Sequence, residues 1–505
     1  MSDAPSDTQR LARTAAESER RRVVSGPDAL LISDWLHITA DGSIEVYTGK
    51  VEVGQNIRTS LAQAVAQELC VLPGSITLIM ADTDRTPFDA GTFGSQTTPI
   101  MSRRLRAVAA SARELLIDRA AARWQCERGG LSVDNGQVID RQAGRAIGFG
   151  ELTQGQPITQ PYDPDVPLTP AHAWTVAGTD APKVAGRAIV TGAHRYTPDL
   201  VRPNLWAGAV LRPAAIGATL QSLDTSAAET LPDVLIVRDG EFVGVVAPDR
   251  PRALQAVQAL RAEWTRSEQP SSSELFDYLR SHPAPPPDDP RIAAMHREER
   301  GSIEQGLVAG AHLLEQRYTH AYIAHAPLEP RSAVAEWQDG RLTVWTGTQR
   351  PFGVRGELAT AFDLPEEQVR VIVPDTGSAY GGKHTGEAAV EAARLARAAG
   401  RSIKLIWTRE EEFSWAYLRP AGLIEIRSVV QLDGTISGWE YHNYNSGAAG
   451  MRTPYAVPHQ RIIYHPSQSP LRQGSYRALA ATANTFARES HMDDLAALVG
   501  LDPLD

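Results

Sequence analysis

The loop best suited to bind a ligand through its backbone is Gly377-Ser378-Ala379-Tyr380-Gly381-Gly382-Lys383-His384. It follows an apolar run typical of a strand and precedes a run typical of a helix, Glu387 to Ala399. Its spacing satisfies most of the pattern G-x-x-x-x-G-K-[ST], in which backbone N–H groups hold phosphates and a hydroxyl binds magnesium. His384 stands at the hydroxyl position, and an imidazole is a poor ligand for magnesium. The loop therefore favours close backbone approach to a ligand over nucleotide hydrolysis, with a structural turn as a further alternative.

Several other segments, taken in order along the chain, resemble the molybdopterin-binding motifs of the xanthine dehydrogenase (molybdenum hydroxylase) family. Besides Ser378–Lys383, they are His325–Pro330, Thr348–Phe352, Tyr476–Leu479 and Phe486–Ala496. The segment Val53–Thr59 resembles the family's G-Q-G loop, with Asn56 in place of the second glycine. Because this segment precedes the others, the arrangement is most similar to the large subunits of the isoquinoline 1-oxidoreductase and nicotinate dehydrogenase type.

The resemblance implies roles for individual residues. Gln349 would donate a hydrogen bond to an oxo ligand of molybdenum, and Arg477 would orient a polar or anionic substituent of the substrate, so these two are expected to act in catalysis. The full set of expected cofactor-binding residues is Gln55, Gly94, Ser95, Gln96, Thr97, Gln349, Tyr380, Gly381, Gly382 and Arg477. Glu329, His325 and His384 are expected to have structural roles. No protein side chain is expected to bind the metal, because in this family the pterin dithiolene does so.

The implied activity is an oxidoreductase reaction, the hydroxylation of an N-heteroaromatic compound or an aldehyde with water as the oxygen source. The implied cofactor is molybdenum–molybdopterin, with its cytosine dinucleotide form as one alternative. Two cysteines, Cys70 and Cys126, are too few to hold an iron–sulfur cluster, so a [2Fe–2S] cluster is expected only on a partner subunit. A scaffold or assembly subunit without turnover, or a fragment of such an enzyme, is the alternative from a different class.

The family's catalytic glutamate belongs to a Gly-x-Gly-Glu motif that has no counterpart here, so the catalytic base stays unassigned. Two alternatives stay open: a truncated chain, or a split subunit whose remaining part comes from a second polypeptide.

Composition limits the other partners that we expect. Because the net charge is −10 and no long Lys/Arg run occurs, a nucleic-acid partner is not expected. No apolar run reaches about 18 residues, so no membrane span is expected and the predicted location is the cytoplasm.

Local patterns predict an α+β, multidomain chain, and the resemblance implies a molybdopterin-binding fold with an α/β hammerhead domain and two related cofactor-binding lobes. We expect a hairpin over Trp35–Thr48, strands over Ile76–Met80, Ala188–Thr191, Leu235–Val237 and Phe242–Val246, and helices over Ser60–Leu69, Arg103–Trp124 and Arg252–Trp264. A helix over Gly356–Phe362 and a strand over Val369–Val373 repeat the order found near the N-terminus. This repetition predicts two related halves with a site between them.

Proline-rich stretches mark the expected domain boundaries. The expected parts are a disordered tail (1–28), an N-terminal molybdopterin-binding lobe (29–152), a Pro-rich linker (153–175), the hammerhead domain (176–267), a Pro-rich connector (268–300) and the main molybdopterin-binding region, incomplete at its C-terminus (301–505).

Overall fold

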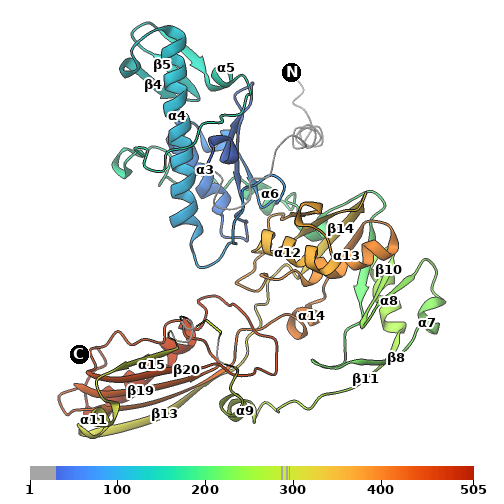
Figure 1. The fold of residues 1–505 in the computed structure, drawn as a ribbon, viewed down its shortest axis with the longest axis vertical. Helices are drawn as coiled ribbons and strands as arrows, with labels where there is room; N and C mark the ends of the chain where they lie inside the picture. Colours follow the sequence, from blue (N-terminus) through green and yellow to red (C-terminus); the bar gives the residue numbers. More distant parts are fainter. Residues whose placement is uncertain (1–29, 286–287, 290, 292–293, 295, 505) are drawn as a thin grey trace.

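The structure, a computed structural model, describes residues 30–285, 288, 289, 291, 294 and 296–504. The whole of the expected disordered tail (1–28) and part of the Pro-rich connector lie outside the described residues. Three bodies are visible in Figure 1: an N-terminal lobe around α3 and α4, a central body built on a seven-stranded sheet, and a C-terminal lobe with a five-stranded sheet. The expected α+β character is confirmed.

The N-terminal lobe packs helices on a three-stranded sheet in the order β1-β2-β3. β1 runs antiparallel to β2, and β2 runs parallel to β3. The predicted hairpin, strand and long helix are confirmed. The elements are α2 (Ile32–Trp35), β1 (Leu36–Ile38), β2 (Ile44–Thr48), α3 (Ile57–Leu69), β3 (Ile76–Met80), a π-helix (Thr97–Ser102), α4 (Arg103–Trp124), β4 (Leu131–Asp134), β5 (Gln137–Asp140), β6 (Arg145–Gly148) and α5 (Phe149–Thr153), with 3-10 turns at Pro73–Ser75 and Arg128–Gly130.

The central body contains the mixed sheet β16-β15-β14-β17-β7-β10-β9, on which α12 and α13 pack. Its elements are β7 (Trp206–Val210), β8 (Leu220–Asp224), α7 (Ser226–Glu229), β9 (Leu235–Asp239), β10 (Phe242–Ala247), α8 (Arg250–Ala259), β11 (Arg261–Trp264), β14 (Ser332–Gln338), β15 (Arg341–Thr346), α12 (Pro351–Phe362), β16 (Val369–Ile372), α13 (Glu387–Ala399), β17 (Ile403–Ile406) and α14 (Arg409–Ser414), with a 3-10 turn at Glu366–Gln368. Gly208 and Gly244 allow close packing here, because a Cβ on either would lie within 2.8 Å of Leu395.

The segment 176–267 contributes strands to a sheet that it shares with a later segment, since β7 pairs in parallel with β17 and so extends the sheet of residues 332–406. Two of its predicted elements need correction. The expected strand Ala188–Thr191 lies instead in and just after α6 (Gly186–Val190). The expected helix Arg252–Trp264 ends at Ala259, because the next four residues after Leu260 pair with β8 as β11. Short 3-10 turns at Ala171–Ala173 and Thr197–Asp199 flank α6.

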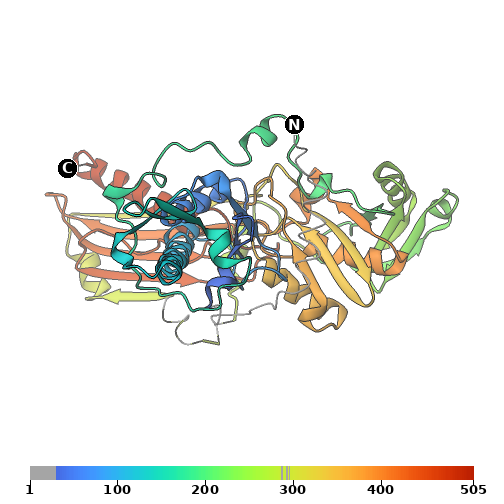
Figure 2. The ribbon, with the colours of Figure 1, turned by 90° about the horizontal axis from the view of Figure 1, so that it is seen from above.

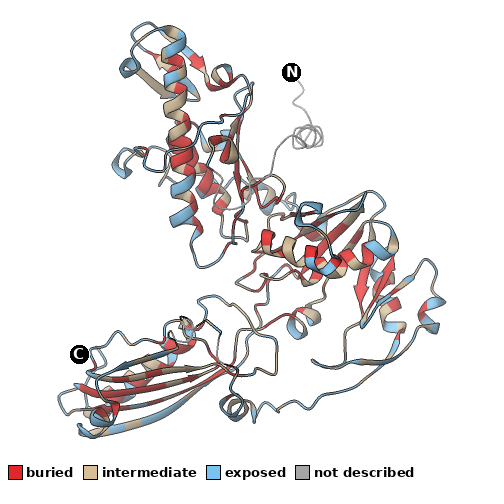
Figure 3. Ribbon diagram, viewed as in Figure 1, coloured by how far each residue is buried: buried red, intermediate tan, exposed pale blue. Residues whose placement is uncertain are grey.

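The C-terminal lobe has the strand order β12-β20-β19-β18-β13, with α15 along one face of the sheet (Figure 2). Its elements are α9 (Leu275–Ser281), β12 (Arg297–Arg300), α11 (Ile303–Val308), β13 (His312–His320), β18 (Gly422–Val430), β19 (Ile436–Tyr444), β20 (His459–His465) and α15 (Ala481–Val499). Its apolar core, which includes Ile426, Trp439 and Leu495, is separate from the core that the N-terminal lobe and central body share. Figure 3 shows buried residues inside each body.

The predicted repetition of two halves is confirmed and is longer than expected. The order hairpin, helix, 3-10 turn, strand occurs as β1-β2-α3-β3 and again as β14-β15-α12-β16, and in both the last strand is parallel to the second. The halves meet end to end, since the Thr83 N–H donates to Val371 O and the Val373 N–H donates to Ala81 O, both at 3.0 Å. Because this joint lies just after β3 and β16, it brings the loops of the two halves together.

Candidate cofactor-binding site

Gln349, which follows β15, links two loops of the site. Its side chain is 5% exposed. The amide Nε2 donates to the carbonyl of Thr92 at 2.9 Å, and Oε1 accepts from the Gly381 N–H at 3.0 Å. The main chain repeats the link, because the Thr92 N–H donates to Gln349 O at 2.8 Å. The Gln349 amide nitrogen carries two hydrogens, and the described residues accept only one of them. The second hydrogen can be donated to a ligand.

The glycine-rich loop passes directly beside the Tyr476–Arg477 segment. Gly381 has φ +91°, and a Cβ on it would lie 3.1 Å from Ser475 O and 3.2 Å from the Tyr476 Cα. A Cβ on Gly382 would lie 2.6 Å from the ring of His325. Both glycines are therefore required by close packing. Tyr380, also at positive φ, is 43% exposed, and its N–H has no hydrogen-bond partner in the described part of the chain.

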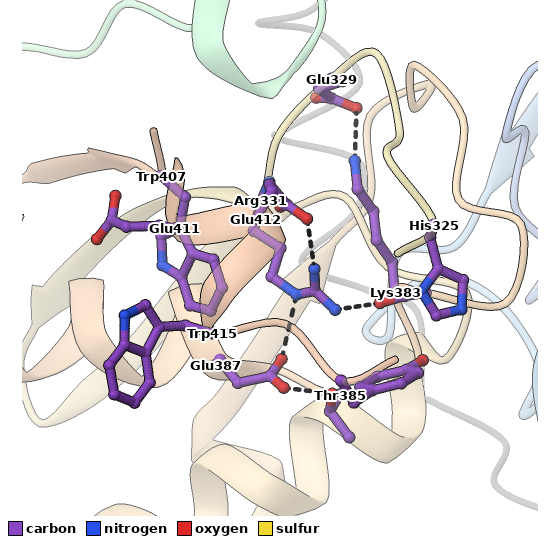
Figure 4. A network of polar contacts seen from close by, with 12 residues as sticks. His325, Glu329, Arg331, Lys383, Thr385, Glu387, Trp407, Glu411, Glu412 and Trp415 are labelled. Atoms are coloured by element: carbon purple, nitrogen blue, oxygen red, sulfur yellow. Dashed lines mark hydrogen bonds and ion pairs between the residues drawn. The ribbon is translucent and has the colours of Figure 1, made fainter. Parts of the chain in front are cut away.

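A buried network of ion pairs and hydrogen bonds holds this loop in place (Figure 4). Lys383 is 1% exposed, and its Nζ lies 3.3 Å from Glu329 Oε2, which also accepts from the Gly377 N–H at 2.7 Å. Arg331 donates to Glu412 at 2.7 Å and to the Gly382 carbonyl. Burial lowers the pKa of Lys383, against the opposing effect of Glu329. Because its ammonium is enclosed and paired, Lys383 cannot reach a nucleotide phosphate, as the nucleotide-hydrolysis alternative requires.

The three residues expected to be structural all pack around the same loop. His325 places Nε2 2.6 Å from Ser475 O. His384 packs its ring 5.5 Å from that of Phe93, and burial lowers its pKa to about 4, so this imidazole is neutral at pH 7. The His384 Nε2 is buried and has no hydrogen-bond partner among the described residues. Glu329 holds the start of the loop through the Gly377 N–H.

Gln55 makes no side-chain hydrogen bond to the glycine-rich loop among the described residues. Its amide closes its own turn, with Oε1 accepting from the Val53 N–H at 2.6 Å and Nε2 donating to Val51 O at 3.0 Å. Asn56 adopts φ +61° at the position of the family's glycine, a conformation that asparagine tolerates. The turn joins the glycine-rich segment through the Thr376 N–H, which donates to Glu52 O at 2.9 Å. A cavity of about 260 Å³ separates it from α6 and is lined by Gly54, Asn56, Arg58, Lys183, His194 and Asp375 among others.

The remaining predicted residues lie at the surface of the same region. Gly94, Ser95 and Gln96 are exposed, whereas Thr97 is buried where the π-helix begins. Arg477 is exposed, and its guanidinium has no hydrogen bond or ion pair within the described ranges. Ala478, where the family has a glycine, adopts φ +65°. Four cavities of the described chain have none of Gln55, Gln349, Tyr380 and Arg477 in their linings.

Two residues that hold the loop escaped sequence reasoning. The Thr92 carbonyl accepts a hydrogen bond from the Gln349 amide. The only sequence feature that marked Thr92 was the Gly/Thr/Ser composition of its loop. Tyr417 donates its hydroxyl to Gly381 O and accepts from the His384 N–H at 3.2 Å, and no local pattern marks it.

The donor groups fit an anionic, oxygen-rich cofactor. Gln349 Nε2, the Tyr380 N–H and Arg477 all offer hydrogens, and no carboxylate pairs with Arg477 among the described residues. Within the same ranges, no three His, Cys, Asp or Glu side chains are grouped to hold a metal ion. The described helices also include none with the length and apolarity needed to cross a bilayer.

Comparison with known proteins points to one family. A family model described as a molybdopterin cofactor-binding domain matches residues 286–505, and a second with the same description matches residues 24–196. A nicotinate dehydrogenase subunit of Pseudomonas putida is 30% identical over 93% of this chain and 42% of its own length. The beta subunit of isoquinoline 1-oxidoreductase from Brevundimonas diminuta is 25% identical over 93% of this chain and 69% of its own. The chain thus spans only part of these relatives.

Solved structures agree on the fold. Quinoline 2-oxidoreductase from Pseudomonas putida 86 superposes with a TM-score of 0.53 at 24% identity, covering 65% of this chain and 49% of that one. Carbon monoxide dehydrogenase from Oligotropha carboxidovorans gives a TM-score of 0.55 at 20% identity, with the same coverage of 65% and 49%. The two domain matches together cover more than half of the sequence. The chain belongs to the xanthine dehydrogenase family, as a molybdopterin-binding large-subunit chain.

Proposed function

We propose that this chain binds molybdenum–molybdopterin and forms the cofactor-binding part of a molybdenum hydroxylase that oxidises an N-heteroaromatic compound or an aldehyde. The observation that carries the proposal is the position of Gln349. Its amide joins the Thr92 loop to the Gly381 loop, and Gly381 in turn touches the Tyr476–Arg477 segment. Three of the motifs that resemble the family's cofactor-binding motifs therefore meet at one place in the fold.

In this proposal, the chain's residues hold and orient the cofactor and the substrate. The free N–H of Gln349 and the main-chain N–H of Tyr380 donate to the cofactor's oxygen atoms, and the Gly94–Thr97 loop and the Gln55 turn contact its pterin or phosphate. Arg477 attracts a polar or anionic substituent of the substrate. When bound, the cofactor supplies two-electron redox chemistry with water as the oxygen source.

The proposal includes a partner. Electrons leave through a separate [2Fe–2S] subunit, because the chain has two cysteines and neither is paired with a second thiol. The names of the relatives, nicotinate dehydrogenase and isoquinoline 1-oxidoreductase, support a heteroaromatic substrate ahead of an aldehyde. We take the cytosine dinucleotide as the cofactor form and the cytoplasm as the location.

The test is metal and cofactor analysis of the full chain purified together with the products of its neighbouring genes. We expect about one molybdenum per complex, and a nucleotide released on acid treatment whose mass identifies the cytosine or guanine form. A complex that assembles without molybdenum would support the scaffold alternative instead and would end the proposal.

A further inference from the structure

Strand β13 forms a long edge of the C-terminal sheet (Figure 1). It pairs with β18 on one side, and no described strand lies on its other side. None of its nine residues is buried. Among the described residues, no backbone hydrogen bond reaches β13 from outside β18. Because an uncovered edge strand presents unpaired N–H and C=O groups, β13 is open to a further strand.

A row of alternating charges crosses the sheet on the face opposite α15 and ends at β13. The residues that lie opposite one another on the five strands are Glu299, Arg461, Glu440, Arg427 and Glu315. Neighbours in this row form ion pairs at 2.9, 3.2, 2.9 and 2.6 Å. Glu315, at the edge, has an arginine on one side only. A further strand would continue the row if it placed a positive charge opposite Glu315.

β13 itself carries that charge at the required position. Arg317 follows Glu315 by two residues, so both side chains lie on the same face of the sheet. If a second copy of β13 pairs antiparallel about a two-fold axis midway between these two residues, Arg317 of each copy lies opposite Glu315 of the other. Arg317 already pairs with Asp277 at 2.9 Å, but a guanidinium has five N–H donors, enough for two carboxylates. Charges on an edge ordinarily discourage pairing, whereas here each charge meets its opposite.

The same two-fold axis gives compatible pairs along the rest of the strand. The remaining opposed pairs are Leu313 with Thr319, Leu314 with Tyr318, and His312 with His320. Leu313 is 52% exposed, and the 53% exposed Phe486 of α15 packs on the Tyr318 ring with 6.0 Å between ring centres. A second copy would cover these apolar groups. Burial lowers the pKa of His320 to about 4, so this ring is neutral at pH 7 and the histidine pair does not oppose two positive charges.

We propose that this chain forms a symmetric dimer in which two copies of β13 pair antiparallel and join the two five-stranded sheets into one continuous sheet. The interface is isologous, because the same strand contributes both the acidic and the basic member of each ion pair. Self-complementary charge order is what favours a second copy over a partner of different sequence. The dimer goes beyond the proposed cofactor-binding function and does not depend on it.

The test is the dissociation constant of the dimer, measured by sedimentation velocity on the full chain over a range of concentrations. Glu315→Arg would oppose two positive charges across the two-fold axis, and Arg317→Glu would oppose two negative charges. Because symmetry doubles each contact, either variant should weaken the dimer at least about tenfold. The matched control is Arg297→Glu on β12, at the other edge of the sheet, where the arginine also pairs with one carboxylate, that of Glu299. It should leave the dissociation constant unchanged.

An equimolar mixture of Glu315→Arg and Arg317→Glu separates this register from any other. In a mixed dimer both opposed pairs again have opposite signs, so the mixture should dimerise about as tightly as the unchanged chain, although neither variant does so alone. If circular dichroism shows that a variant does not fold, hydrogen exchange of the unchanged chain decides instead. The amides of β13 should then exchange more slowly as the protein concentration rises.

A monomeric unchanged chain, a dimer that both charge reversals leave intact, or a mixture that stays monomeric would each overturn the inference. So would β13 amides whose exchange does not depend on concentration. Amides that become protected only when a different subunit is added would assign the edge to that subunit and would also overturn it. Molybdenum content enters none of these measurements, so a chain that dimerises without molybdenum would count against the proposed function alone.

Discussion

Lys383 and Glu329 form a buried ion pair directly behind the glycine-rich loop, with 3.3 Å between Nζ and Oε2. The same carboxylate oxygen accepts the Gly377 N–H at 2.7 Å. One carboxylate thus neutralises the lysine and fixes the first residue of the loop. Farther along the loop, Gly381 and Gly382 pack closely against the neighbouring segments.

Removing the charge of Glu329 should destabilise the protein. In Glu329→Gln, Lys383 stays buried without its nearest anion, and the expected loss is about 3 kcal/mol in the free energy of unfolding. Denaturant unfolding followed by circular dichroism measures it. The control Glu315→Gln breaks an exposed pair with Arg427 and should cost no more than about 0.5 kcal/mol. Adding Lys383→Met to Glu329→Gln should recover most of the loss, and the absence of recovery would contradict this account.

Gly381 should tolerate no side chain, because a Cβ there would press on the Tyr476 segment. Gly340 is the comparison that separates this packing effect from backbone strain. Gly381 and Gly340 have φ values of +91° and +80°, but only at Gly381 would a Cβ meet other atoms. Gly340→Ala should therefore cost about 1 kcal/mol from strain alone. Gly381→Ala should cost more and should lower cofactor content, because the Tyr476 segment must move. Thermal unfolding and molybdenum analysis of both variants check this, and equal effects would disprove the packing argument.

Gln349 should matter to turnover more than to folding. Gln349→Ala removes the amide that bridges Thr92 and Gly381, yet the main-chain bond from the Thr92 N–H to Gln349 O stays. We expect a drop in kcat of about a hundredfold, with most of the cofactor retained. The control is Gln316→Ala, at an exposed position of β13. Turnover equal to that of the control would argue against placing Gln349 at the cofactor.

His491 should make the C-terminal lobe sensitive to acid. The residue is 0% exposed. Its Nε2 lies 2.6 Å from Ser428 Oγ, and its Nδ1 lies 3.1 Å from the Tyr318 hydroxyl. Burial lowers its pKa from 6.5 to about 4. Between those two pH values the unfolded chain binds the proton and the folded chain does not, so stability falls as pH decreases from about 6.5 to about 4.

The expected loss over this window is about 3 kcal/mol. Denaturant unfolding at several pH values measures it. In His491→Gln the stability at pH 7 should fall, and its decrease with acid should become shallower. Exposed His172→Gln should leave the whole profile unchanged. An acid profile unaltered by His491→Gln would show that other groups cause the decrease.

Local elements were predictable where one periodic pattern decides them. The helix Arg103–Trp124 and the strand Ile76–Met80 have the expected bounds, because their apolar residues recur at helical and alternating spacing. The expected helix over Arg252–Trp264 was wrong beyond Ala259, because strand pairing with β8 outweighs local helix propensity there. Sequence patterns also contained no sign that β7 joins the sheet of a distant segment.

The amino-acid sequence by itself determined the family and most of the residues near the glycine-rich loop, because those residues stand in short motifs whose order can be compared directly. Only the tertiary structure decided what these residues contact. It enclosed Lys383 with Glu329, placed Gln349 on Thr92, 257 positions away, and left the Arg419 Nε–H without an acceptor. Such partners come from distant parts of the chain, and packing of the whole molecule, which no local pattern encodes, fixes which polar groups are paired and which stay free.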